Sequence, residues 1–156
     1  MKITASNFIL LTFAFLFSPN KSFSHCQVPC GIFEDSLRIQ LIDEHITTVE
    51  KAMTEIAALS NQENTNYNQI VRWVNNKEIH ATKIQTIVSD YFLYQRIKPA
   101  AVGDHHYAGY MKNLKYLHQL SVYAMKAKQA VNLDVISKMR QTLQGFTMHY
   151  FSEHKH

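Results

Sequence analysis

The sequence predicts an all-α protein built as an antiparallel up-down-up-down four-helix bundle. Two observations support this fold class. Past residue 34, apolar residues recur every three or four positions, and the alternation typical of strands is absent. The helical segments are joined by short connections, which favour antiparallel neighbours. We therefore divide the chain into a removable leader (1–24), a short segment (25–33) and the bundle domain (34–156).

The first helix is expected from about residue 35 to residue 60. Asp35 or Ser36 can cap its start, and Ser60-Asn61 ends it. Its apolar residues step by three or four and share one face, which predicts burial of that face. They are Ile39, Ile42, Ile46, Val49, Met53 and Ile56.

The second helix is expected over about residues 66–95, followed by a connection that contains Pro99 and Gly103. The middle of this helix, residues 75–77 (Asn-Asn-Lys), is poorly patterned, so we expect a kink there. The latter half carries one apolar stripe, formed by Ile84, Ile87, Val88 and Tyr91.

The third and fourth helices each show a regular apolar stripe, and Asn132 is a candidate cap for the fourth. The third stripe consists of Tyr110, Leu114, Leu117, Ser121 and Ala124. The fourth consists of Ile136, Met139, Leu143, Phe146 and Tyr150.

The first 24 residues have the order of a secretory signal peptide. Lys2 is followed by an apolar run over residues 8–17, and Ser22 and Ser24 precede His25 at the positions expected for cleavage. The run is too short for a membrane span, which needs about 20 residues. We expect a leader peptidase to release a chain that begins at His25, is not bound to a membrane and is periplasmic or secreted.

Composition excludes several classes of protein. Hydrophobic residues make up 46% of the chain, with four glycines and three prolines, which argues against disorder and against a turn-rich β-sandwich. The formal net charge of +4 falls to +2 once Lys2 and Lys21 leave with the leader. This charge is too weak to suggest a nucleic-acid partner, and it suits a small anionic substrate only weakly.

The predicted cleavage brings several metal donors together. Both cysteines of the chain, Cys26 and Cys30, lie within six residues of the cut in His-Cys-Gln-Val-Pro-Cys-Gly. Cleavage frees the α-amine of His25, whose ordinary pKa of about 8 makes it readily deprotonated. This amine, the Cys26 amide nitrogen and two thiolates suit a square-planar ion, Ni(II) or Cu(II) rather than zinc. The His25 imidazole remains within reach of an axial position.

The motif at residues 25–31, directly after a removable leader, resembles the nickel hook of the nickel superoxide dismutases. Residues 89–92 (Ser-Asp-Tyr-Phe) also resemble a segment of that family. The resemblance implies that nickel, one ion per subunit, cycles between the +2 and +3 states and converts superoxide to oxygen and hydrogen peroxide. It also implies a homohexamer of four-helix bundles with the hooks at subunit contacts. A cytoplasmic location, with a dedicated protease removing the leader, is the alternative to export.

The resemblance assigns His25, Cys26 and Cys30 as the metal ligands, with the His25 side chain binding axially when nickel is oxidised. Two positions depart from the family pattern. Phe33 stands where the family usually has a tyrosine near the metal, so Tyr91 becomes the candidate for ordering water or substrate. Gln40 stands where an acidic residue can hold the axial histidine. The arginine that assists in some members has no evident counterpart.

Two further residues are candidates for the surroundings of the metal. Asp90 lies in the segment that resembles the family, beside Tyr91. Lys98, just after the second helix, is a candidate for attracting superoxide through a local positive field. A plain surface position is the alternative for Lys98.

Simpler interpretations stand beside the nickel site. Two cysteines in an exported protein commonly form a disulfide, and Cys26 and Cys30 could close a small loop. Haem attachment is disfavoured, because it needs C-x-x-C-H and three residues separate these cysteines. An exported protein that binds nickel or copper without turnover is the alternative function.

Other residues with metal-binding chemistry are expected to be structural. Residues 104–106 (Asp-His-His) are interpreted as a polar helix start, and His154 and His156 as a solvated tail. Trp73 is expected in the core or at a subunit interface. The histidines scattered along the helices are also expected to be structural; they are His45, His80, His118 and His149.

Overall fold

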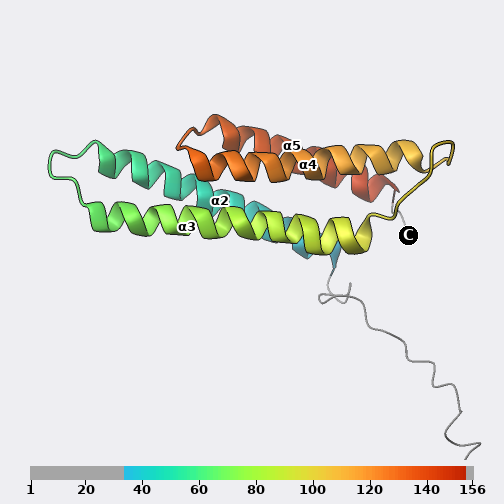
Figure 1. Cartoon of the computed structure of the whole chain (residues 1–156), viewed down its shortest axis with the longest axis horizontal. Helices are drawn as coiled ribbons and strands as arrows, with labels where there is room; N and C mark the ends of the chain where they lie inside the picture. The colour runs from blue at the N-terminus through green and yellow to red at the C-terminus, as the bar shows by residue number, and fades with distance from the viewer. Residues whose placement is uncertain (1–33, 154–156) are drawn as a thin grey trace, which may run out of the picture.

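The computed structural model describes residues 34–153, and these form an all-helical bundle. The elements are α2 (Asp35–Ser60), α3 (Tyr67–Thr86), the π-helix η1 (Ile87–Arg96), α4 (Tyr107–Gln129) and α5 (Asp134–Glu153). Figure 1 shows α2 and α3 running antiparallel, with η1 continuing α3, and α4 and α5 packed antiparallel beside them. Contacts of α2 with α3, α3 with α4, α4 with α5 and α5 with α2 close the ring. The predicted fold class and helix order are confirmed.

The core is made by the four apolar stripes. Ile42, Ile46, Leu117, Phe146 and others from every helix are fully buried. Burial of each such side chain contributes about 1.5–3 kcal/mol, which explains why the period of apolar residues located the helices. Phe92 lies at the aromatic centre, with its ring edge-to-face against Phe146 at 4.9 Å between centroids.

Side-chain caps mark two of the predicted boundaries. Asn66 Oδ1 accepts a hydrogen bond from the Gln69 amide at 3.1 Å, and Asn132 Oδ1 accepts one from the Asp134 amide at 2.9 Å. These bonds satisfy amide groups that a helix start leaves without a partner. The cap expected at the start of α2 was wrong, because Glu34 occupies that position without a side-chain cap bond. Asp35 is the first helical residue instead, and its carboxylate bonds elsewhere in the bundle.

The kink expected at residues 75–77 was also wrong, since α3 runs unbroken through them. Lys77, only 4% exposed, explains the poor apolar pattern. Its ammonium donates hydrogen bonds to the carbonyls of Lys128 at 2.7 Å and Ala130 at 3.3 Å. A cation there satisfies carbonyls at the C-terminus of α4 and complements the helix dipole. A polar residue in the buried stripe thus ties α3 to α4.

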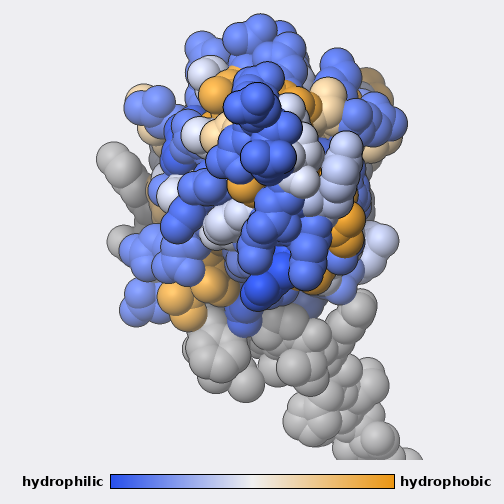
Figure 2. All heavy atoms as spheres, turned by 90° about the vertical axis from the view of Figure 1, so that its left-hand side faces the viewer, coloured by the Kyte–Doolittle hydropathy of each residue, from blue (hydrophilic) through white to orange (hydrophobic). Residues whose placement is uncertain are grey.

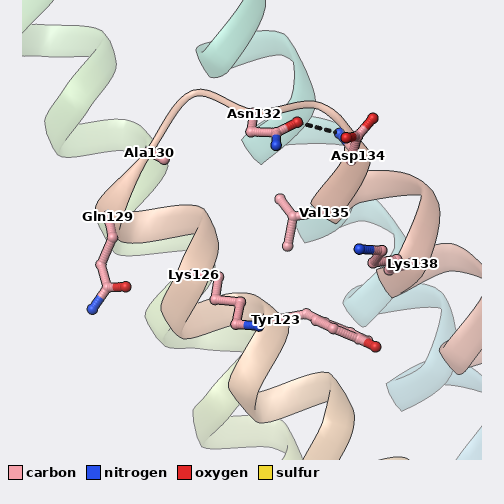
Figure 3. A pocket seen from close by; sticks show the side chains of 8 residues that line it. All are labelled: Tyr123, Lys126, Gln129, Ala130, Asn132, Asp134, Val135 and Lys138. Carbon is pink, nitrogen blue, oxygen red and sulfur yellow. Dashed lines mark hydrogen bonds between the residues drawn. The ribbon is translucent and has the colours of Figure 1, made fainter.

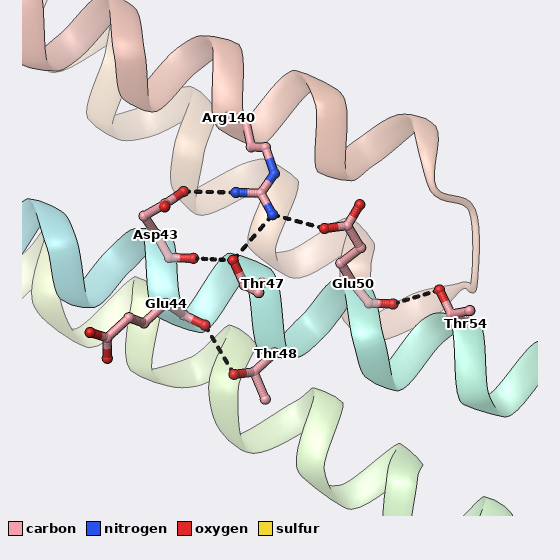
Figure 4. Close-up of polar contacts among 7 residues, drawn as sticks. All are labelled: Asp43, Glu44, Thr47, Thr48, Glu50, Thr54 and Arg140. Carbon is pink, nitrogen blue, oxygen red and sulfur yellow. Dashed lines mark hydrogen bonds and ion pairs between the residues drawn. The ribbon is translucent and has the colours of Figure 1, made fainter.

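A second polar tie joins α5 to α2 on the surface. Arg140 donates to Asp43 and to Glu50 at 2.8 Å each, and to the Thr47 hydroxyl at 3.1 Å (Figure 4). The acceptors lie about one turn apart on α2, so a single guanidinium spans two turns of the neighbouring helix. The residues are well exposed, so we expect each ion pair to contribute at most about 1 kcal/mol.

The end of the bundle that carries the α2–α3 connection is mainly hydrophilic. Figure 2 views this end, and its surface is largely blue with separated orange areas. The connection, residues 61–66, is polar and mostly exposed. Across residues 34–153, no helix combines the length and the apolar character that crossing a bilayer would require.

Candidate metal centre

The predicted metal ligands His25, Cys26 and Cys30, together with Phe33, lie outside the described residues. The described chain begins at Glu34, and α2 begins at the next residue. In the sequence, the segment 25–33 directly precedes these residues. The surroundings of Asp35 are the part of the candidate centre that the structure describes.

Asp35 is the hub of a polar cluster formed by three helical elements. Its Oδ2 accepts hydrogen bonds from the Tyr150 hydroxyl and from Nη2 of Arg96, both at 2.8 Å. Its Oδ1 accepts a hydrogen bond from the Tyr91 hydroxyl. The Asp35 side chain is only 13% exposed, so these donors replace the water that the carboxylate lost on folding. We call Asp35, Tyr91, Arg96 and Tyr150 the Asp35 cluster.

The π-helix explains how Tyr91 and Arg96 reach the same carboxylate. Residues five apart point about 140° away from each other around an α-helix of 3.6 residues per turn. In η1 the hydrogen-bond spacing is one residue longer, as in the bond from the Ile97 amide to the Phe92 carbonyl at 2.8 Å, so position i+5 lies close to position i. The widened turn thus brings the phenol and the guanidinium to one side of the element. A search for helical period alone could not reveal this pairing.

The cluster perturbs the pKa of each acidic member. Burial and the hydrogen bond to Asp35 raise the pKa of Tyr91 to about 12. The same two causes raise the pKa of Tyr150 to about 12. Burial opposes the charge on Asp35, but the hydrogen bonds from Tyr91, Arg96 and Tyr150 outweigh it and lower the pKa of this carboxyl. At neutral pH the cluster therefore holds one carboxylate, one guanidinium and two protonated phenols.

Two arginines lie against the Tyr91 ring. The guanidinium carbon of Arg38 is 5.2 Å from the ring centroid, and that of Arg96 is 6.0 Å away. The arginine that had no evident counterpart in the sequence thus has two candidates, both against the Tyr91 ring. Sequence reasoning missed Arg96 because it lies outside the resembling segment and depends on the π-helical turn.

Lys98 lies beside this cluster. Lys98, Arg96, His106 and Tyr110 line a hollow of about 430 Å³ where the connection after η1 meets α4. The Lys98 side chain is exposed, which fits both attraction of an anion and a plain surface position, so its role stays a prediction. The structure brings Lys98 and the Asp35 cluster to the same end of the bundle.

Gln40 and Asp90 lie apart from the cluster contacts. Gln40 is exposed and lines the groove between α2 and α5, which Arg140 also lines. Asp90 accepts a hydrogen bond from the Ser89 hydroxyl at 2.7 Å, and its carbonyl accepts one from the Gln95 amide group at 2.6 Å. Asp90 thus has local partners within η1. The roles of both residues near the metal stay predictions.

Residues 104–106 come before α4, as the sequence analysis expected. The Asp104 carboxylate accepts a hydrogen bond from the His106 amide at 2.8 Å and lies 3.3 Å from His105 Nδ1. The three side chains could hold a metal ion, since their ligand atoms all lie within 4.8 Å of one another, but all are exposed. Trp73, expected in the core or an interface, is half-buried, with the Lys51 ammonium 5.8 Å from its ring.

A separate hollow of about 330 Å³ lies where α4 turns into α5. Figure 3 shows Tyr123, Lys126 and Lys138 among its lining residues, and Figure 1 places this turn far along the bundle from the start of α2. None of the predicted site residues lines it. This hollow is therefore not part of the candidate centre.

Comparison with known proteins adds one finding. The family model for nickel-containing superoxide dismutase matches residues 20–155, a range that includes the motif at 25–31 and all the described helices. No curated protein and no solved structure gives a significant match to the chain.

Proposed function

Because the chain belongs to the family of nickel-containing superoxide dismutases, we propose that it binds nickel through His25, Cys26 and Cys30 after removal of residues 1–24. Family membership assigns an enzyme that converts superoxide to oxygen and hydrogen peroxide with a nickel cofactor. It therefore favours turnover over the alternative of metal binding without catalysis. The motif His-Cys-x-x-Pro-Cys-Gly at the predicted cut is the single observation that carries the ligand assignment.

The donor set fits nickel on chemical grounds. Two thiolates, a deprotonated amide and an amine provide the planar nitrogen and sulfur ligands that Ni(II) prefers. Bound nickel supplies the one-electron exchange between its +2 and +3 states. The thiolates and the amide raise the electron density that makes the higher state accessible. Without a metal, the same thiols are open to oxidation by the peroxide product.

The Asp35 cluster has a positioning role in this proposal. Asp35 lies five residues after Cys30 in the sequence, and its carboxylate is tied to η1 and α5. Fixing the first turn of α2 limits the positions that the preceding residues can take. A pKa of about 12 makes Tyr91 a poor proton donor at neutral pH, which favours positioning over proton delivery. Contact of Tyr91 with substrate stays a prediction.

Lys98 is the candidate source of positive charge near an anionic substrate, since Arg96 is paired with Asp35 and Asp104 lines the same hollow. Lys98 and Arg96 both line this hollow beside the cluster, and Lys98 is exposed. Fields of this kind raise the rate at which a charged substrate arrives, and salt weakens them. We therefore expect Lys98→Ala to lower the rate at low ionic strength and to have little effect at high ionic strength. An equal loss at both would assign Lys98 a different role.

Ligand variants test the proposed site. Cys26→Ser and Cys30→Ser should each abolish nickel-dependent superoxide removal, because each deletes a thiolate. His25→Ala keeps the amine and should retain nickel while slowing turnover. Nickel content by elemental analysis and superoxide decay by pulse radiolysis measure the two effects separately. Full activity in Cys30→Ser would refute the thiolate assignment.

The departure at Phe33 has its own test. Phe33→Tyr restores the hydroxyl usual in the family and removes no proposed ligand. We expect unchanged nickel content, with any effect confined to the turnover rate. A large loss of nickel would contradict the ligand set.

We further propose that the leader directs export and is removed before His25. The support is the order of Lys2, an apolar run and small residues before the cut. Mass spectrometry of the native protein should find His25 at the amino terminus, and cell fractionation should place the protein outside the cytoplasm. An active enzyme with another first residue would exclude the amine ligand. A correctly cut cytoplasmic enzyme would instead indicate a dedicated protease.

A homohexamer is the proposed assembly, as the family resemblance implies. Large apolar side chains are well exposed near the site end of the bundle, including Val102 at 83% and Tyr94 at 69%. An interface would cover such residues. Light scattering on the nickel-loaded enzyme should give six times the mass of one chain, and a monomeric active enzyme would refute this assembly.

A further inference from the structure

Two histidines face each other across the contact between α2 and α3. His45 Nδ1 and His80 Nδ1 lie 3.2 Å apart, and the rings are edge-to-face with centroids 4.9 Å apart. Both side chains are half-buried, so solvent reaches the pair. Nothing in the proposed dismutation uses them.

The separation of the two nitrogens suits a shared metal ion. Imidazole nitrogens bind zinc at about 2.0–2.1 Å, so two of them on a tetrahedral ion lie about 3.3 Å apart. A right angle between the same bonds, as in square-planar coordination, gives about 2.9 Å. The observed 3.2 Å lies between these values. This spacing requires no separation of the two helices, and the rings need only turn so that both Nδ1 atoms point at the ion.

The protonation of the pair is compatible with metal binding. Burial lowers the pKa of both His45 and His80, and the nearby Lys83 lowers it further. The rings are therefore neutral at neutral pH. A hydrogen bond between the two Nδ1 atoms requires that one of them carries a proton and that the other accepts the hydrogen bond. A shift of that proton to Nε2 of the same ring leaves both Nδ1 lone pairs available, and the positive charge of Lys83 weakens binding without blocking it.

We propose that His45 and His80 form a two-histidine site for a divalent transition-metal ion such as Zn²⁺ or Ni²⁺, with water as the remaining ligands. The bound ion would join α2 to α3. This site differs from residues 104–106, whose three potential ligands are consecutive in the chain and exposed. Of these two candidate sites, the His45–His80 pair is the one whose ligands come from two different helices, which separate on unfolding.

The test uses the chain that begins at His25 with Cys26→Ser and Cys30→Ser, so that the thiolates of the predicted hook do not compete. Urea unfolding is followed with and without Zn²⁺, and then with Ni²⁺. An ion that binds the folded state more tightly than the unfolded state raises the midpoint. We expect such a rise in the parent protein.

Substitution of either histidine should remove this rise. With one imidazole left, the binding constant from direct titration should fall on the order of 10²-fold, the gain that a second linked ligand brings. Each variant, His45→Ala or His80→Ala, is compared with its own metal-free midpoint, so a loss of intrinsic stability does not affect the result. The matched control, His105→Ala with His106→Ala, should keep the rise.

Two outcomes would overturn the proposal. One is a parent protein whose midpoint does not move with either ion. The other is a rise that persists in His45→Ala and disappears in the control, which would place the ion at residues 104–106. Because the two cysteines are absent throughout, neither outcome depends on the proposed thiolate ligands, and His25 is the same in every variant that is compared.

Discussion

The hydroxyl of Tyr150 donates a hydrogen bond of 2.8 Å to Asp35 Oδ2, and so joins the end of α5 to the first residue of α2. These residues are far apart in the sequence, and the bond forms only because α2 and α5 are neighbours in the ring. Tyr91 and Arg96 complete the attachment from η1. Asp35, which follows the predicted ligand segment in the sequence, is thus held by three helical elements.

Removing the hub of this cluster should destabilise the bundle. Asp35→Ala leaves two buried phenols and a guanidinium without their shared acceptor, so we expect a loss of about 2–3 kcal/mol in the free energy of unfolding. Urea denaturation measures it. Asp43→Ala, which removes an exposed partner of Arg140, is the matched control and should cost less than about 1 kcal/mol. Equal losses in the two variants would show that the Asp35 cluster contributes no more to the free energy of unfolding than an exposed ion pair does.

The two cluster phenols should ionise only at strongly alkaline pH. The chain has eight tyrosines, and Tyr91 and Tyr150 have pKa values raised to about 12. The folded state thus favours the protonated phenols. Their contribution to stability is complete below about pH 10 and is lost as the pH rises towards 12.

Tyrosinate absorbance during an alkaline titration measures this effect. Tyr91→Phe should remove one late-titrating group. A single ionisation step shared by all tyrosines, in a chain still folded by circular dichroism, would contradict the assignment.

Lys77 should be more important for stability than an ordinary helix lysine. Lys77→Met keeps the length of the side chain but leaves the carbonyls of Lys128 and Ala130 without their donor. We expect a loss of about 1–3 kcal/mol in chemical denaturation. Lys126→Met, an exposed lysine in the last turn of α4, is the control and should change stability by less than about 0.5 kcal/mol. A neutral Lys77→Met would show that the buried ammonium is dispensable.

The effect of Gly145→Ala on the free energy of unfolding should change sign when Tyr116 is replaced. An added Cβ would lie 2.8 Å from the ring of Tyr116, closer than real contacts allow. The atoms that the Cβ would meet are the outer atoms of the half-buried Tyr116 ring, so Gly145→Ala should destabilise the protein by about 1 kcal/mol, the low end of the cost of overpacking. In a Tyr116→Ala background the same change should stabilise by up to about 1 kcal/mol, the helix-propensity gain of alanine. A double-mutant cycle measures the coupling, and the same sign in both backgrounds would exclude the clash.

The period of the apolar residues was sufficient to predict the bundle, but it led to the wrong prediction of a kink at residues 75–77. Four regular stripes located the helices, because burying one face of each helix is the dominant favourable term in folding. The stripe of α3 is interrupted by Lys77, which looked like a kink. In three dimensions its ammonium reaches the end of α4, a partner that no local pattern indicates.

The ligand motif and the nickel family were also accessible from the sequence, because residues 25–31 are consecutive and their donor chemistry depends on order alone. The contacts of the residues that follow that motif could not be predicted from the sequence. Asp35 was expected to be a helix cap and Tyr150 to be part of an apolar stripe, and no role was expected for Arg96. Only the packing of α2, η1 and α5, with the wider turn of the π-helix, brings them to one carboxylate. Chain order thus determined the fold class and the proposed donors, whereas contacts between residues far apart in sequence decided what supports them, since such contacts exist only after the helices pack.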